Sequence, residues 1–388
     1  MIRGGAADVR VFAVEDTAAQ VCWRELPAGT VVRAGDASAV VAGGGDSPGA
    51  TVLAGLAPGR RYSLTVTRPG RAPEPVGAFS TLAPPPGREL CRFATVNDVH
   101  VGEPSFGVLR TIREPRRRPG SGGGYATRCL TAALAEARAW GAQALVVKGD
   151  LTWQGRAREW EEVAGLLGAA GIPVAAVAGN HDVGSKAVDG RRILAAHGIE
   201  VPDHPFSLDL PGIRIVLAHS AVAHRSHGHV GEVQRAVVAD LVAGAPAAAF
   251  VGLHHYLHRF GVPLSYPPGI AGADADALLD ALAEANPATL VSSGHSHRNR
   301  RRTVGPLVVT QVGATMHYPG VWAGYAVHEG GIRQVVRRVA EPSAIAWTER
   351  TSHALLGGWR LWATGLRSHR CFSHPWPARA DGGPLSSA

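Results

Sequence analysis

The pattern of apolar and polar positions changes after a proline-rich stretch in the first quarter of the chain. Before it, short runs alternate apolar and polar side chains between Gly, Pro and Asp turns, as half-buried strands do. Beyond it, strand-length apolar runs are followed by alanine-rich stretches such as 127–140 and 158–170, whose spacing predicts helices. The pattern therefore predicts a small all-β domain over 1–83, a linker over 84–89 and an α/β domain over 90–340.

The first domain contains a turn followed by a tyrosine and an alternating run, "LAPGRRYSLTV", at 56–66. This stretch resembles the tyrosine corner of fibronectin type III-like sandwiches, with Tyr62 at the corner and Trp23 on an early strand. The resemblance implies an all-β sandwich. Its strands are expected over 8–15, 18–25, 37–43, 50–56 and 61–68.

The segment over 341–388 is expected to be a tail that is partly helical and then disordered over its last dozen residues. Trp347, Trp359 and Trp362 are spaced like one face of a helix, interrupted by two glycines. We expect this face to pack against its own domain rather than against a membrane or a partner.

Composition narrows the class of protein. The hydrophobic fraction of 45% is ordinary for a globular chain. The sequence contains no run of about 18 apolar residues, so we expect no membrane span. The N-terminus lacks the apolar core of a secretory signal, and the four cysteines form no C-x-x-C pair. We therefore expect a cytoplasmic protein with free thiols.

The net charge of +8 comes almost entirely from arginine and favours anionic partners. Nucleic acid and a small phosphate ester both fit this balance. The loop "EPRRRPGSGGG" at 114–124 is either a solvated surface loop or a mobile basic flap over a phosphate site.

Polar side chains recur at the ends of five apolar runs in the α/β domain. In such a sheet the carboxyl ends of the strands form one edge, where binding sites are built. We therefore expect these side chains to meet on a common rim. They are Asp98 and His100 after "RFATVN", Asp150 after "ALVVKG", Asn180 and His181 after "VAAVAG", His254 and His255 after "AAAFVGL", and His295 and His297 after "TLVSSG".

Bound divalent cations would explain why these side chains occur together. Clustered carboxylates repel one another and buried imidazoles need partners, whereas Asp and His together suit manganese, iron or zinc. Seven candidate ligands are too many for one ion and suit two ions that share one ligand. The candidates are Asp98, His100, Asp150, Asn180, His254, His295 and His297.

The motifs "DVH", "GDLTWQG", "GNHD", "LHH" and "GHSH" resemble those of the calcineurin-like metallophosphoesterases, and all five occur in order across about 90–340. The resemblance implies a four-layer α/β/β/α sandwich with a dinuclear metal centre. It also implies how the ligands divide: Asp98, His100 and His297 to the first ion, Asn180, His254 and His295 to the second, and Asp150 to both.

The resemblance leaves His181 free to contact the phosphoryl group or to protonate the leaving group. His255 and Asp182 would support a ligand or contact the substrate. Many relatives read "GDxxDxG", but Trp153 stands where the second aspartate would be, so Asp182 or Asp189 is a candidate to orient His181.

Two further positions depart from expectation. Relatives often read "HHP" where this chain has "HHY", and we favour His254 over His255 as the metal ligand. Lys148 lies inside an apolar run, where we expect its side chain to extend to the surface.

The function implied is hydrolysis of a phosphate ester, with a hydroxide that bridges two cations as the nucleophile. "GDLTWQGRAREW" most resembles the branch with bacterial cyclic-nucleotide phosphodiesterases. A fibronectin-like module is typical of purple acid phosphatases, but their metal-binding tyrosine does not follow Asp150 here. We expect a phosphodiesterase or a broad phosphoesterase with a small phosphate-ester substrate and manganese or iron, or else zinc.

Three alternatives stay open. A nuclease on the same core fits the positive charge, although no basic stripe with interleaved aromatic side chains is evident. A phosphomonoesterase or protein phosphatase would use the same ligands. A non-catalytic docking protein is disfavoured because all seven candidate ligands are present.

Overall fold

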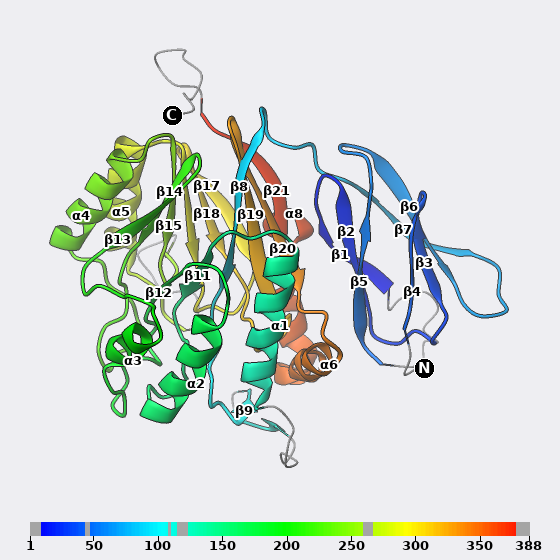
Figure 1. Ribbon diagram of the computed structural model, residues 1–388, viewed down its shortest axis with the longest axis horizontal. Helices are drawn as coiled ribbons and strands as arrows, with labels where there is room; N and C mark the ends of the chain where they lie inside the picture. Colours follow the sequence, from blue (N-terminus) through cyan, green and yellow to red (C-terminus); the bar gives the residue numbers. More distant parts are fainter. Residues whose placement is uncertain (1–8, 43–46, 108–109, 115–122, 259–266, 378–388) are drawn as a thin grey trace.

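The computed structural model describes residues 9–42, 47–107, 110–114, 123–258 and 267–377. The basic loop around 116–118 and the expected disorder at the end of the chain lie outside these residues. Figure 1 shows an all-β part, in blue, beside a larger mixed part.

The N-terminal part consists of two antiparallel sheets around a small apolar core. Their orders are β1-β2-β5 and β4-β3-β6-β7. The expected strands form, and two further strands, β3 and β7, were not predicted. The strands are β1 (Val9–Val14), β2 (Ala18–Trp23), β3 (Val31–Ala34), β4 (Ala37–Val40), β5 (Gly49–Ala54), β6 (Arg61–Thr67) and β7 (Glu74–Ser80).

The larger part is the expected layered sandwich of two six-stranded sheets with helices outside them. One sheet has the order β12-β11-β8-β19-β20-β21, and the other β13-β14-β15-β16-β18-β17. In Figure 1, α4 and α5 lie on the left of the sheets, while α2 and α1 lie toward the bottom of the view.

The strands of the first sheet are β8 (Glu89–Val96), β11 (Leu145–Lys148), β12 (Val174–Val177), β19 (Val321–His328), β20 (Gly331–Arg338) and β21 (Cys371–Pro375). Those of the second are β13 (Phe206–Leu210), β14 (Ile213–Leu217), β15 (Ala248–Gly252), β16 (Thr289–Ser293), β17 (Arg300–Val304) and β18 (Leu307–Gln311). The main helices are α1 (Tyr125–Ala139), α2 (Ala157–Gly168), α3 (Gly190–Ala196), α4 (Glu232–Ala243) and α5 (Gly272–Ala285). A short hairpin, β9 (Ser105–Phe106) with β10 (Ile112–Arg113), lies outside both sheets.

The two sheets face each other through a continuous core, in which Phe93 of β8, Phe250 of β15 and Tyr325 of β19 pack ring against ring. Lys148 does not reach the surface as expected. Its side chain is fully buried, and Nζ donates to Ser292 Oγ at 2.8 Å across the gap between the sheets.

The tail packs on the sandwich more closely than its sequence indicated. It contains α6 (Pro342–Thr351), a 3-10 turn over Ala354–Gly357, α7 (Gly358–Thr364), α8 (Arg367–Arg370) and then β21, which pairs with β20. The three tryptophans therefore do not share one helix face. Trp347 is buried against Tyr125, Trp359 is half-buried, and Trp362 is 38% exposed.

The N-terminal part is joined to the rest by buried polar contacts. The side-chain amide of Gln20 of β2 donates to the carbonyl oxygen of Arg338 of β20 at 2.7 Å and accepts from its main-chain N–H at 2.8 Å. Trp140 Nε1 donates to Glu15 Oε2 at 2.9 Å. Phe12 lies in the core of the larger part rather than in its own. These contacts fix the small part against the sandwich.

Within the described residues, no helix combines the length and the apolar composition that crossing a bilayer requires. All four cysteines are buried as free thiols.

Candidate metal centre

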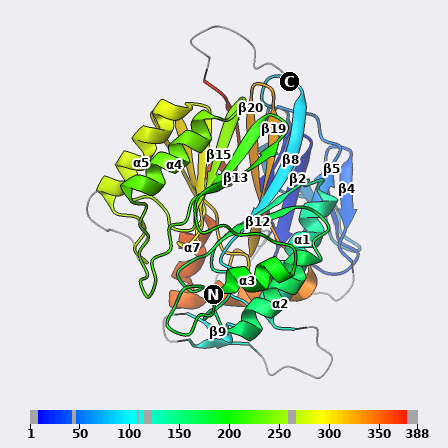
Figure 2. The same ribbon diagram turned by 60° about the vertical axis from the view of Figure 1, so that its left-hand side comes forward.

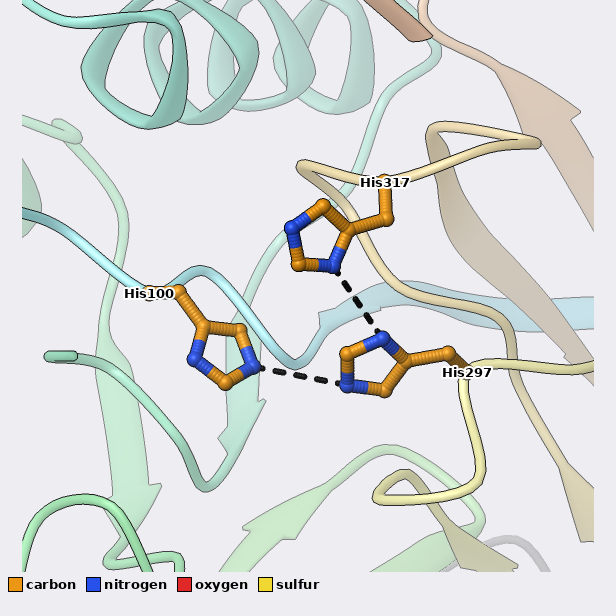
Figure 3. A group of neighbouring side chains, drawn as sticks. All are labelled: His100, His297 and His317. Carbon is orange, nitrogen blue, oxygen red and sulfur yellow. Dashed lines mark hydrogen bonds between the residues drawn. The ribbon is translucent and has the colours of Figure 1, made fainter. Parts of the chain in front are cut away.

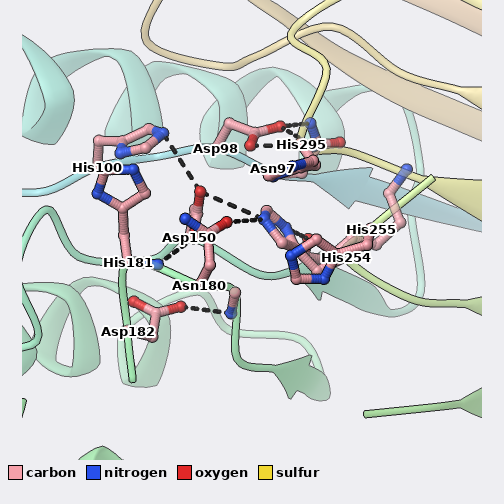
Figure 4. Close-up of polar contacts among 12 residues, drawn as sticks. Asn97, Asp98, His100, Asp150, Asn180, His181, Asp182, His254, His255 and His295 are labelled. Atoms are coloured by element: carbon pink, nitrogen blue, oxygen red, sulfur yellow. Dashed lines mark hydrogen bonds and ion pairs between the residues drawn. The ribbon is translucent and has the colours of Figure 1, made fainter. Parts of the chain in front are cut away.

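Side chains from both sheets converge at the carboxyl ends of the central strands (Figure 4). The loops after β8, β11 and β12 bring Asp98, His100, Asp150, Asn180 and His181, and the loops after β15 and β16 bring the other histidines. Most of these side chains are buried. All seven candidate ligands belong to this cluster: Asp98, His100, Asp150, Asn180, His254, His295 and His297.

The backbone at these strand ends is strained. Five of the nine non-glycine residues with positive φ among the described residues belong to the cluster. Residues with a side chain adopt this conformation at a cost, and it persists where the surrounding fold imposes it. The five are Asp98, His100, Asp150, His295 and His297, with φ between 51° and 65°.

Asp150 lies between two groups of ligands. Its Oδ2 is 3.3 Å from His254 Nε2 and 3.7 Å from His100 Nε2. Its Oδ1 accepts a hydrogen bond from the main-chain N–H of His181 at 2.9 Å. A methyl group on Gly179 would overlap the Asp150 carboxylate, so the glycine of "GNHD" allows this close approach.

One group surrounds Asp98. Its Oδ1 is 3.3 Å from His297 Nε2, which is itself 3.4 Å from His100 Nε2 (Figure 3). The main-chain N–H of His295 donates to both Asp98 oxygens. His297 Nε2 therefore lies within 3.4 Å of a ligand atom of Asp98 and of one of His100.

The second group surrounds His254. Its Nδ1–H donates to the carbonyl oxygen of Lys148 at 2.9 Å, which turns Nε2 toward Asp150 and toward Asn180 Oδ1 at 3.2 Å. A backbone carbonyl that fixes one ring nitrogen and frees the other is typical of metal-binding histidines. The ring of His295 completes this group at 5.0 Å from that of His254.

His255 is held differently. Its Nδ1 lies 3.0 Å from Ser220 Oγ, and its Nε2 is buried with no hydrogen-bond partner. Its ring is 4.4 Å from that of His295. His254, His255 and His295 nevertheless bring ligand atoms within 4.8 Å of one another, so His255 lies at the edge of the same group.

Two residues of the centre were missed by the sequence analysis, Glu103 and His317. His317 Nδ1 is 3.1 Å from His297 Nδ1, and His317 Nε2 is 3.3 Å from Glu103 Oε2. Glu103 Oε2 also lies 3.7 Å from His100 Nδ1. Glu103 lies three residues after His100, so its position in the sequence could have identified it as a neighbour of that ligand. His317 belongs to none of the five motifs, so the sequence did not indicate it.

Burial and mutual charge set the protonation of the cluster. Burial and the neighbouring His181 lower the pKa of His100 to about 3, and burial and His254 lower that of His295 to about 3. Burial also acts to lower the pKa of His254, but Asp150 outweighs it and raises the pKa to about 9. Since a metal binds the neutral ring, a cation at this end must displace a proton from His254.

The orientation of His181 does not depend on a carboxylate. Its Nδ1–H donates to the main-chain carbonyl oxygen of Trp153 at 2.8 Å. Neither Asp182 nor Asp189 takes this place: Asp189 caps α3 through Arg191, and Asp182 is occupied elsewhere. The residue whose side chain departs from the family pattern therefore supplies the acceptor from its backbone, and among the described residues no hydrogen bond engages Nε2 of His181.

Asp182 lies beneath the cluster with 2% of its surface exposed. Its oxygens accept hydrogen bonds from the N–H groups of Leu151, Thr152 and Gly179 and from the Thr152 hydroxyl, at 2.6 to 3.0 Å. Asp182 therefore ties the loop after β11 to the loop after β12.

The donor set fits divalent cations. Four overlapping groups bring His and Asp ligand atoms within 4.8 Å of one another. Buried polar atoms without hydrogen-bond partners, among them His100 Nδ1 and Glu103 Oε2, border the same space. Oxygen and imidazole ligands without cysteine suit manganese, iron or zinc.

Residues 91–299 match the family model described as calcineurin-like phosphoesterase. A probable cyclic nucleotide phosphodiesterase of Psychrobacter sp. (strain PRwf-1) is 27% identical over 182 residues, which are 45% of this chain and 52% of that protein. The chain thus matches about half the length of this curated relative.

Among solved structures, a dimetal phosphatase from Danio rerio has a TM-score of 0.51 at 16% identity. The match covers 66% of this chain and 98% of that one, and it shows a shared fold. A purple acid phosphatase from yellow lupin seeds has a TM-score of 0.46 at 12% identity, over 86% of this chain and 73% of that one.

Proposed function

The chain belongs to the calcineurin-like phosphoesterase family, hydrolases of phosphoric ester bonds, and from this premise we propose that it is a metal-dependent phosphodiesterase. Cyclic nucleotides are the first substrate class to test, because the Psychrobacter relative is a probable cyclic nucleotide phosphodiesterase. The observation that carries the proposal is the position of Asp150, whose carboxylate lies within 3.7 Å of imidazoles from both ligand groups.

Asp98, His100 and His297 would hold one divalent cation, and Asn180, His254 and His295 a second, with Asp150 shared. Manganese and iron are the first candidates, and zinc is the third. Two cations bound there would lower the pKa of a water molecule and withdraw charge from the phosphate oxygens.

His181 is the proposed acid of the reaction. The Trp153 carbonyl fixes its Nδ1–H, so Nε2 faces the substrate side and can donate a proton to the leaving oxygen. Burial acts to lower the pKa of His181, but Asp150 and the Trp153 carbonyl raise it above the usual value of 6.5. A raised pKa keeps more of the ring protonated near neutral pH.

The test is turnover of bis-p-nitrophenyl phosphate, p-nitrophenyl phosphate and cyclic AMP by protein loaded with manganese or iron. We expect two ions per chain and faster hydrolysis of diester than of monoester. Asp150→Asn should abolish both activity and full metal loading. Faster monoester hydrolysis, or full activity after chelation, would contradict the proposal.

Variants of the His181 contact give a sharper test. His181→Ala should lower kcat by roughly 10²–10⁴-fold without changing the metal content. Trp153→Ala keeps the main-chain carbonyl, so its kcat should stay within a few-fold of the wild type. Equal losses in the two variants would show that the Trp153 side chain, not its carbonyl, supports His181.

We also propose that 1–83 is a fibronectin type III-like domain joined by 84–89 to a catalytic domain over 90–340, to whose first sheet the tail adds β21. Its three- and four-stranded sheets support this assignment. So does Tyr62, whose hydroxyl accepts a hydrogen bond from Ala57 N five residues upstream, as at a tyrosine corner.

A further inference from the structure

Apolar side chains reach solvent together in one short part of the tail. Nine large apolar side chains are exposed among the described residues, and five of them lie within 355–366, whereas the other four are single valines. Isolated exposed apolar residues are normal, but a cluster marks an interaction surface. The five, here named the leucine patch, are Leu355 (59% exposed), Leu356 (106%), Leu361 (84%), Trp362 (38%) and Leu366 (62%).

The backbone holds part of the patch outward. Leu355 and Leu356 have φ of 53° and 56°, so two bulky residues in succession adopt the left-handed conformation. This conformation is rare for residues with large side chains and is found where function or the surrounding fold requires it. Strained backbone and exposed leucines are both unfavourable in water, and both coincide here.

The surroundings of the patch are basic. Residues 350–377 contain four arginines and neither Asp nor Glu. The strand β17 beside α7 begins with three successive arginines, of which Arg300 is exposed. Arg360 pairs with Glu349 at 3.0 Å, whereas Arg300 is exposed and lies beside the ring of Trp362.

Arg298 adds a buried positive charge next to the patch. It is only 5% exposed, its guanidinium lies 3.9 Å from the centroid of the Trp362 ring, and its Nη1 has no hydrogen-bond partner among the described residues. A buried guanidinium donor without an acceptor is costly, and it places a positive charge directly against the ring of Trp362.

A cavity of about 740 Å³ opens between α7, α8 and β17. Its walls combine Arg10, Arg300, Arg360 and His369 with Leu361 and Trp362, and no Asp or Glu lines it among the described residues. The cavity therefore offers cationic and apolar walls side by side.

We propose that the leucine patch docks on an anionic lipid bilayer. The leucines and Trp362 enter the interfacial region while the arginines pair with lipid phosphates. Nucleic acid would pair with the arginines but leave the leucines in water, and an apolar protein partner would leave the arginines without anions. A bilayer surface presents phosphates and acyl chains next to each other and satisfies both.

Docking would orient the metal centre. Trp359, on the inner side of α7, lies with its ring 6.2 Å from that of His297 and 5.2 Å from that of Phe106. Figure 2 shows α7 close to the middle of the molecule, below the strands. The rim of the centre would thus face the membrane surface. The inference concerns where the protein sits and does not depend on the proposed reaction.

The test is flotation of the full chain with phosphatidylcholine vesicles, with and without phosphatidylglycerol, at low and high salt. We expect binding to the anionic vesicles, weakened by salt, and little binding to phosphatidylcholine alone. Leu356→Ser combined with Leu361→Ser should weaken vesicle binding by about tenfold or more. Arg300→Glu should weaken binding to the anionic vesicles alone.

Val233→Ser is the matched control, because Val233 is 81% exposed on α4, outside the patch. It should bind vesicles like the wild type. Circular dichroism and thermal unfolding verify that each variant is folded, and Leu366→Ser replaces the double variant if that one does not fold.

Four outcomes would overturn the proposal. The first is no binding to anionic vesicles at low salt, and the second is an equal loss of binding in the Val233→Ser control. The third is that the leucine variants alter self-association but not vesicle binding. The fourth is that single-stranded DNA binds the protein with an affinity that the leucine substitutions do not change. The third outcome would identify a second copy as the occupant, and the fourth a nucleic acid.

Discussion

His317 lies one layer behind the proposed ligands, with its ring between His297 and Glu103. If His297 binds a cation through Nε2, its Nδ1–H donates to His317 Nδ1, and His317 Nε2–H then points to Glu103 at 3.3 Å. Phe106 stacks on the His317 ring at 3.9 Å between centroids and limits its rotation. Contacts of this kind orient a metal ligand and increase its basicity.

His317→Ala should therefore weaken manganese binding by about 10–100-fold, because His297 loses the acceptor that fixes its ring. Competition with a fluorescent chelator measures this directly, without any assay of turnover. His317→Gln can accept from His297 and donate to Glu103, so it should recover part of the affinity. Equal affinity in all three proteins would mean that His317 only fills space.

At the scale of elements, Lys148 of β11 is a polar bridge between the two sheets. Its ammonium donates to Ser292 Oγ and to the Ser293 carbonyl oxygen of β16, at 2.8 and 3.2 Å. Burial lowers its pKa to about 7, against the opposing charge of Asp98. The bridge joins the strand that precedes Asp150 to the strand that precedes His295.

We expect Lys148→Ala to lower the free energy of unfolding by about 2–4 kcal/mol, because it leaves a cavity and an unsatisfied Ser292 hydroxyl. Lys148→Met keeps most of the volume and should cost less. Urea unfolding with and without excess manganese separates this loss from any change in metal binding. A Lys148→Ala protein as stable as the wild type would exclude the bridge as a stabilising contact.

The elements also show what the sequence could predict. Polar motifs directly after apolar runs predicted which loops meet, because parallel strands deliver their ends to one edge. His317 and the strand β21 gave no such signal, since their places depend on contacts with residues far away in the chain. Trp153 was interpreted from its side chain, whereas its role comes from its carbonyl oxygen, which every residue type possesses.

At the scale of the whole molecule, Glu349 of α6 joins three parts of the chain. Its carboxylate pairs with Arg24 beside β2, Arg338 of β20 and Arg360 of α7, at 2.9 to 3.0 Å. Burial acts to raise the pKa of Glu349, but the arginines, Arg338 foremost, hold it below the usual value of 4.5. The contact locks the N-terminal part, the sandwich and the tail together.

Glu349→Gln should destabilise the protein by about 3 kcal/mol at neutral pH, because three arginines lose a buried partner. Since the folded-state pKa lies below the unfolded value of 4.5, the stabilisation is complete above pH 4.5 and is lost as the pH falls through the folded pKa. The difference in unfolding free energy between wild type and variant should therefore shrink below pH 4.5.

Glu329→Gln is the control for this prediction, because Glu329 pairs with Arg88 at the exposed surface at 3.5 Å. Its effect should stay below about 1 kcal/mol at every pH. A difference between wild type and Glu349→Gln that does not change with pH would argue against the ion pairs as its cause.

The pairing of the two ends of the chain bears on its biosynthesis. The N–H of Val14 donates to Cys371 Sγ, 357 residues later, and Arg370 donates to the carbonyl oxygen of Phe12 at 2.9 Å. These contacts of β1 therefore form only after residues 370 and 371 have emerged from the ribosomal exit tunnel. Until then this part of β1 is open to chaperones, and a stop codon before position 370 would remove these contacts permanently.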